Sequence, residues 1–148
     1  MRIRGRTDSA TKLSEKHIQE TCTAFLELDR WRALKTDPVS RREWAKGFGE
    51  LGMADHLYIR YVNIPLRDPA DPRIVRANMG APHAEVLWIE WKSKRGKPKP
   101  NQLEWHRAER ARGALTLIAG EDFPATIEGF KNWYRESGLM RNTSIKMK

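Results

Sequence analysis

The chain has only one cysteine, Cys22, in 148 residues. A single cysteine excludes an intramolecular disulfide and any zinc site built from several cysteines. The four histidines show no zinc-ligand spacing, and they are His17, His56, His83 and His106. We therefore expect a reducing, intracellular setting, such as the cytoplasm of a bacterium or of a phage-infected host.

Long apolar runs are also missing. No window is apolar enough to span a membrane, so we expect no membrane association. The basic start of the chain, residues 1–6, is followed by no apolar stretch, so we expect no signal peptide. Without repeats or low-complexity tracts, residues 1–148 are predicted to form a single domain. Residues 1–12 and 140–148 are expected to be flexible basic tails.

Acidic residues are outnumbered. The chain has 28 Lys and Arg against 19 Asp and Glu, giving a net charge of +9 and a pI near 10.0. Such an excess favours nucleic acid or another polyanion as the partner. A basic protein that is merely soluble is the simpler alternative.

Hydrophobic periodicity predicts an α/β fold. A helix begins after Ser14 and carries one apolar stripe, and strands follow near residues 33–35 and over 55–62. Residues 63–84 are interpreted as an irregular excursion joining two strands of a hairpin. A central strand over 85–92, a helix over 100–112, a strand over 114–119 and a last helix capped by Asp122 complete the chain. We predict a mixed central sheet flanked by helices.

The segment Glu90-Trp91-Lys92 closes an apolar run that is typical of a buried strand. Burying a charge is costly unless it meets a partner or a metal. Because strand side chains alternate between faces, Glu90 and Lys92 are expected on one face and Trp91 on the other. A salt bridge at an edge strand would explain the same pair without any chemistry.

Two further polar residues flank this strand in the sequence. Asp55 precedes the earlier apolar strand, and Gln102 opens the later helix. Asp55 and Glu90 on adjacent strands would offer the hard oxygen ligands that Mg²⁺ and Mn²⁺ prefer, with the carbonyl of Trp91 pointing to the same place. Lys92 would steer water and neutralise a phosphate. The loop between Lys92 and Gln102 contributes cations suited to DNA backbone contacts, namely Lys94, Arg95, Lys97 and Lys99.

These motifs, in this order, resemble the VRR-NUC domain, the virus-type replication-repair branch of the PD-(D/E)xK nucleases. The matching segments are Ser14–Gln19, Gly52–Asp55, Ile89–Lys92 and Ser93–Gln102, within residues 14–134. The resemblance implies a restriction-endonuclease-like core. It also implies that Asp55 and Glu90 bind Mg²⁺ or Mn²⁺, that Lys92 serves the water, that Gln102 orients the site and that Glu15 adds a further acid.

Two departures and two alternatives accompany this resemblance. Ala54 stands where the family has proline, and Lys99 stands where it has a serine or threonine helix cap. Lys99 loses a capping bond that contributes about 1 kcal/mol. Glu15 has the simpler role of a first-turn complement to the helix dipole. Gln102 has the simpler role of a side chain that folds back on its own helix start.

The expected function is that of a metal-dependent DNA endonuclease. The resemblance further implies a homodimer acting on branched DNA such as Holliday junctions, because two sites would cut two strands. One alternative is a nuclease acting on flaps, nicks or single strands, or a restriction-like enzyme. The other is a basic DNA-binding protein of the same fold that does not cut.

Overall fold

The computed structural model describes residues 14–36, 50–63, 66–67, 70, 75–76 and 82–142. The expected N-terminal tail and residues 143–148 lie outside this part of the chain. Within it, the helices and strands follow the predicted order closely.

A four-stranded mixed sheet forms the centre of the molecule. Its strands lie in the order β1 (Arg32–Lys35), β2 (His56–Val62), β5 (His83–Glu90) and β6 (Leu115–Ile118). The first three are antiparallel, and β6 runs parallel to β5. The hairpin predicted around residues 63–84 is therefore confirmed. Two short strands within that excursion, β3 (Leu66–Arg67) and β4 (Val75–Arg76), form an antiparallel pair of their own.

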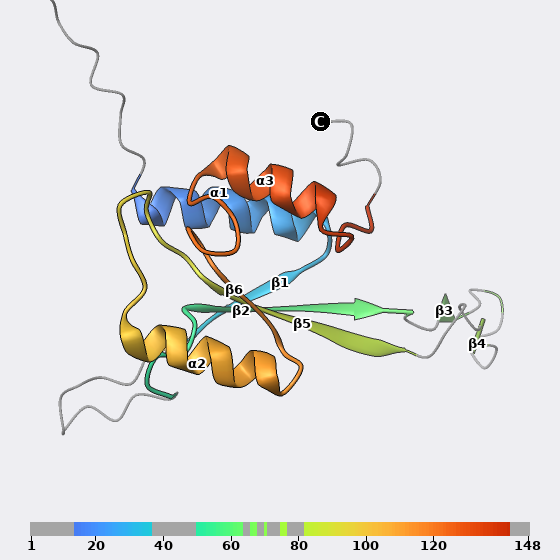
Figure 1. Cartoon of the computed structure of the whole chain (residues 1–148). Coiled ribbons are helices and arrows are strands. Elements are labelled where there is room, and N and C mark those ends of the chain that lie inside the picture. The colour runs from blue at the N-terminus through green and yellow to red at the C-terminus, as the bar shows by residue number, and fades with distance from the viewer. Residues whose placement is uncertain are drawn as a thin grey trace, which may run out of the picture.

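Helices cover both faces of this sheet (Figure 1). α1 (Glu15–Leu28) and α3 (Ile127–Glu136) lie side by side on one face, and α2 (Pro100–Ala111) lies on the other. The prediction of an α/β fold with a mixed sheet between helices is confirmed. The crossover from β5 to the parallel strand β6 runs through α2, as a parallel pair requires.

Of the two predicted helix N-caps, one is confirmed and the other is wrong. The Ser14 hydroxyl accepts the His17 backbone N–H at 3.1 Å, as expected of an N-cap. Asp122, in contrast, does not cap α3, because Thr126 holds that position and accepts from the Gly129 N–H. The Asp122 carboxylate instead accepts from the Ile118 N–H at 2.7 Å, since it lies in the turn that directly follows β6.

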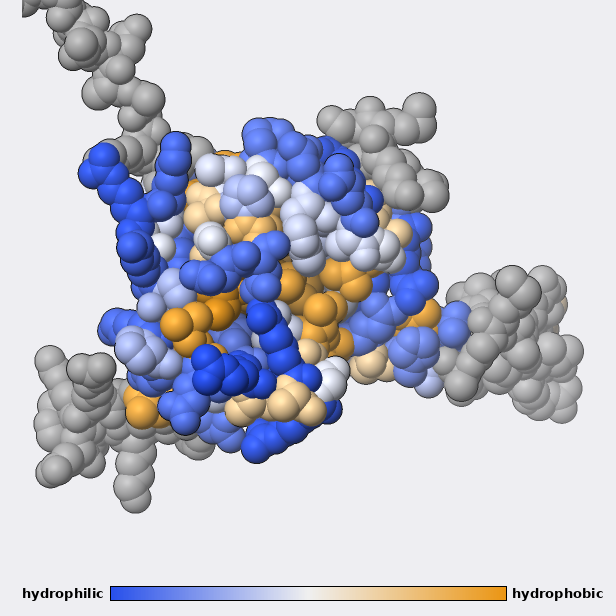
Figure 2. Space-filling view, viewed as in Figure 1, coloured by the Kyte–Doolittle hydropathy of each residue, from blue (hydrophilic) through white to orange (hydrophobic). Residues whose placement is uncertain are grey.

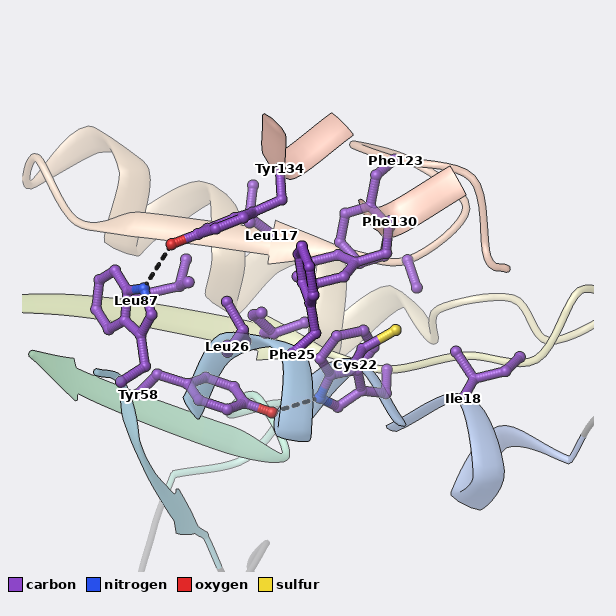
Figure 3. Packing of buried hydrophobic residues seen from close by; sticks show 14 of the residues in the cluster. Ile18, Cys22, Phe25, Leu26, Tyr58, Leu87, Leu117, Phe123, Phe130 and Tyr134 are labelled. Carbon is purple, nitrogen blue, oxygen red and sulfur yellow. Dashed lines mark hydrogen bonds between the residues drawn. The ribbon is translucent and has the colours of Figure 1, made fainter. Parts of the chain in front are cut away.

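The main core lies between the sheet and the α1–α3 layer (Figure 3). Two buried indole N–H groups in it donate to tyrosine hydroxyls, Trp31 to Tyr134 at 2.8 Å and Trp91 to Tyr58 at 2.9 Å. The predicted apolar stripe of α1 is buried there, and it consists of Ile18, Cys22, Phe25 and Leu26. Because the indole N–H groups of Trp31 and Trp91 both have an acceptor, neither is an unpaired buried donor, which would cost stability.

The C-terminal segment is tied down further along than expected. A flexible tail was predicted from residue 140, yet the backbone N–H groups of Arg141 and Asn142 donate to the Asp29 carboxylate. Met140 packs against the core. The physical reason is that Asp29 is buried and needs hydrogen-bond donors.

On the face shown in Figure 2, the surface over the helices is predominantly hydrophilic, and apolar side chains are visible at the level of the sheet. In the part of the chain that the structure describes, no helix is both long enough and apolar enough to span a bilayer.

Candidate functional site

At the end of β5, the side chains of Glu90 and Lys92 lie on one face of the sheet, and Trp91 lies on the face that packs in the core. Glu90 has no exposed surface, and Trp91 beside it is equally buried. The Trp91 ring packs against Phe130 of α3, with ring centroids 5.1 Å apart. Lys92 returns to the side of Glu90, so the predicted alternation of faces is confirmed.

Three groups donate to the Glu90 carboxylate. The Lys92 ammonium lies 2.7 Å from Oε1, and the Gln102 side-chain amide donates to the same oxygen at 2.6 Å. The Asp55 backbone N–H donates to Oε2 at 3.2 Å. The salt bridge weighed as a simpler explanation of Glu90 and Lys92 is present, but it lies in a buried setting shared with two further motif residues.

Asp55 is held by a turn that packs tightly on α2. Gly52 has a φ of +80°, and a Cβ at this position would lie 2.2 Å from the Asn101 carbonyl oxygen. Only glycine allows both the left-handed backbone and this close approach. On the other side, the Asp55 carbonyl accepts the Thr36 N–H at 2.9 Å. These contacts fix Asp55 between β1 and the start of α2.

Gln102 makes the contacts that both of its predicted roles would require. Its Oε1 accepts the Lys99 backbone N–H at 2.9 Å, which is the fold-back onto the helix start. Its Nε2 donates to Glu90, which is the predicted site role. Lys99 provides no side-chain cap, as its departure from serine or threonine predicts. The one amide therefore couples the start of α2 to the end of β5.

A pocket of about 380 Å³ opens over these groups. All five residues predicted as catalytic line it: Glu15, Asp55, Glu90, Lys92 and Gln102. Lys99 also lines it, whereas Lys94, Arg95 and Lys97 are exposed on the adjoining loop. Trp91, whose carbonyl was expected at the metal, is not among the lining residues. The structure thus brings together side chains from α1, β5, α2 and the turn before β2.

The two carboxyl groups influence each other's ionisation. Burial raises the pKa of Glu90, the charge of Asp55 raises it further, and the bond to Lys92 only partly offsets them, leaving a pKa of about 7. Burial also raises the pKa of Asp55, against the lowering effect of Lys92. Negative charge at this place is therefore incompletely compensated by the protein's own cations.

This donor set fits a hard divalent cation. Burial raises the pKa of both carboxyl groups, and Mg²⁺ or Mn²⁺, which prefer oxygen ligands and retain several waters, would stabilise their ionised forms. Within the described ranges, no cluster of three or more His, Cys, Asp and Glu side chains forms a complete cage. Asp55 and Glu90 would thus supply part of the coordination, and water or substrate oxygens the rest.

Some contributors were missed in the sequence. Asn101 and Met53 line the pocket, and the Asp55 main-chain N–H acts through its bond to Glu90. Gln19 contacts the His56 ring at 3.1 Å, directly beside Asp55. The glycine of the turn before Asp55 was the one signal for the Asn101 contact. No local pattern predicts a contact between residues 37 positions apart.

Comparison with known proteins finds no matching family model, no matching curated protein and no matching solved structure.

Proposed function

We propose that this protein is a metal-dependent endodeoxyribonuclease that hydrolyses phosphodiester bonds with Mg²⁺ or Mn²⁺. One observation carries the proposal. Five residues from four separate segments of the chain line one pocket; the order of the motifs predicts Asp55, Glu90, Lys92 and Gln102, and the family resemblance adds Glu15. A chance acid-x-lysine pair would not have Asp55, Gln102 and Glu15 beside it.

Each residue has a role that its contacts support. Asp55 and Glu90 would hold the metal, which when bound polarises the phosphate and lowers the pKa of a bound water. Lys92, whose ammonium lies at the pocket, would orient the attacking water and neutralise the phosphate charge. Gln102 keeps Glu90 oriented through its 2.6 Å bond. Glu15, half-buried at the rim, would bind water of the metal's outer shell.

The exposed cations beside the pocket support DNA as the substrate. Lys94, Arg95 and Lys97 follow closely after Lys92 and are exposed, and their side chains form no ion pair with any residue in the part of the chain that the structure describes. Phosphate contacts of this kind supply affinity without sequence information. The overall charge of +9 favours the same partner.

The finer parts of the proposal rest on the motif resemblance. They are a restriction-endonuclease-like core, a preference for branched DNA such as four-way junctions, and a homodimer whose two sites cut two strands. The mixed sheet flanked by helices is compatible with that core. Light scattering with and without junction DNA tests the dimer, and a monomer mass in both would reject it.

The central test is cleavage by the purified protein. Labelled four-way junction, flap, nicked and plain duplex DNA are incubated with Mn²⁺, Mg²⁺ or EDTA. We expect metal-dependent cleavage by the wild type, and Glu90→Gln should lower the rate by at least about a thousandfold because a metal ligand is lost. Glu104→Gln is the matched control, since this exposed acid on α2 lies outside the pocket.

Three results would count against the proposal. Cleavage by Glu90→Gln at the wild-type rate would show that a contaminating nuclease is being measured or that the site is wrong. DNA binding without cleavage in any metal, with no metal bound, would favour the non-catalytic DNA-binding alternative. Equal losses in Glu90→Gln and Glu104→Gln would show an effect of net charge alone.

A further inference from the structure

We propose that Gln19 of α1 is a positioning residue, which holds Asp55 in its metal-binding place by fixing the neighbouring His56 ring. The inference rests on the proposed function and deepens it. It assigns to the first helix a role in setting the distance between Glu15 and Asp55.

The contact lies at the edge of the pocket. The Gln19 Nε2 atom is 3.1 Å from the His56 Nε2 atom. His56 opens β2 immediately after Asp55, and it is 6% exposed. Its ring also stacks on Tyr58, with centroids 5.9 Å apart and planes 24° apart. The ring is thus held on one side by packing and at one nitrogen by α1.

The direction of this hydrogen bond fixes the state of the ring. An amide nitrogen can only donate, so His56 Nε2 accepts and the proton of the neutral ring is on Nδ1. Among the residues that the structure describes, the buried Nδ1 atom has no hydrogen-bond partner. An unsatisfied buried donor costs stability, so the pair is not explained by stability alone.

A second hydrogen bond joins the same side of α1 to β2. Glu15, Gln19 and Thr23 are four residues apart and therefore project from one side of the helix. Thr23 shares a 2.7 Å hydrogen bond with the Tyr58 hydroxyl, two residues beyond His56 on β2. Gln19 and Thr23 thus both join α1 to β2. Glu15 is one turn before Gln19, on the side of Gln19 away from Thr23, and it lines the pocket that contains Asp55.

Thr23 supplies a matched control for Gln19. Both side chains are half-buried, and both join α1 to β2. Only Gln19 contacts the residue beside Asp55. Thr23→Val should lower the midpoint temperature of thermal unfolding, because a hydrogen bond is lost, and leave metal binding unchanged. Gln19→Met keeps the length and removes the donor, and it should weaken metal binding about tenfold, the low end for losing an outer-shell partner.

The experiment measures Mn²⁺ affinity by calorimetry without DNA, kcat and KM for cleavage, and thermal unfolding, for wild type, Gln19→Met and Thr23→Val. Gln19→Met should lose Mn²⁺ affinity and kcat while the KM for DNA stays constant. Nitrogen-15 NMR of the His56 ring should show the Nδ1–H tautomer in wild type and a mixture of tautomers in Gln19→Met.

The outcomes separate the two proposals. Wild-type Mn²⁺ affinity in Gln19→Met, or an equal loss of affinity in Thr23→Val, would reject the positioning role and leave the nuclease proposal standing. An Nε2–H tautomer in the wild type would also reject it. If the wild type neither binds Mn²⁺ nor cuts DNA, the proposed function fails, and the positioning role fails with it.

Discussion

The β2–β5 pair carries a cluster of buried charge at each end, and the two clusters are balanced differently. At one end lies the candidate site, with Asp55 and Glu90. At the other lies what we term the arginine clamp, which consists of Asp29, Arg60, Glu85 and Arg141. Arg60 is almost fully buried, donates to Asp29 at 2.7 Å and to Glu85 at 2.5 Å, and lies over the Trp31 ring. Arg141 also donates to Glu85.

The pKa values of two glutamates on β5, Glu85 and Glu90, are therefore shifted in opposite directions. Burial raises the pKa of both. At Glu85 the hydrogen bonds and charges of Arg60 and Arg141 outweigh burial, and the pKa is lowered. At Glu90 the nearby charge of Asp55 adds to burial, and the pKa rises to about 7. Five positions along one strand separate a glutamate that is paired with two arginines from one whose cation, Lys92, also acts on Asp55.

The comparison shows where the protein leaves room for a ligand. The clamp pairs two acids with two arginines, whereas the candidate site offers Lys92 to both Asp55 and Glu90. In a chain with net charge +9, this pocket is lined by three acids and two lysines. A divalent cation would balance the excess of acids, which is why we propose the metal-dependent reaction at the site and not at the clamp.

The largest effect on folding is expected from removing the central cation of the clamp. Arg60→Met should lower the free energy of unfolding by about 3–5 kcal/mol, because the buried Asp29 loses its ion pair. Lys92→Met should cost less than about 1 kcal/mol, since Glu90 takes up a proton near neutral pH. Denaturant unfolding at pH 7 measures both, and equal losses would erase the distinction between the two ends.

A smaller effect, with opposite signs, is expected from the pH dependence of stability. The folded-state pKa of Glu90 lies above its ordinary value of 4.5, so the stability it contributes is present below that value and is lost as pH rises through about 7. The free energy of unfolding of Glu90→Gln, relative to that of the wild type, should therefore increase from pH 5 to pH 8 by on the order of 1–3 kcal/mol without metal.

Glu85→Gln provides the opposite case. The lowered pKa of Glu85 contributes stability above 4.5 that is lost as pH falls through its folded pKa. This variant should be less stable than the wild type at pH 7, and the difference should shrink on acidification. Thermal unfolding in EDTA across pH 3–8 checks both variants. Parallel curves for the two would contradict the assigned ionisation states.

The smallest effect on the fold is expected from the exposed cations beside each region. Changing Lys94, Arg95 and Lys97 together to alanine should alter stability by less than about 0.5 kcal/mol. It should weaken binding to all DNA shapes alike and reduce the slope of log affinity against log salt by roughly 2–3 units. Binding is measured in Ca²⁺ over a salt series.

Arg30, an exposed residue beside the clamp, gives the control for this measurement. Arg30→Asn suits the left-handed backbone there, where φ is 69°, and should leave the salt slope unchanged. An unchanged slope in the loop variant would place the DNA elsewhere on the molecule. A slope reduced equally by Arg30→Asn would indicate binding spread over the whole basic surface.

Much of the fold follows from local patterns in the sequence. The apolar stripe of α1, the alternation through Glu90, Trp91 and Lys92, and the Pro100 start of α2 predict elements that the structure confirms. These features depend on neighbours within a few residues. The Asp122 cap was wrong because an acid near a helix start has two local uses, and the turn after β6 took this one.

The sequence by itself determined which residues could do chemistry, because residue type and spacing along a strand or helix are local properties. Only the tertiary structure decided that Glu15, Asp55, Glu90 and Gln102 share one pocket, that Gln19 contacts His56, and that Glu85 and Glu90 have opposite pKa shifts. The physical reason is that burial and charge depend on distance in space. Contacts that decide it here join residues as far apart in the chain as Gln102 and Glu90, at 12 positions, and Arg141 and Glu85, at 56.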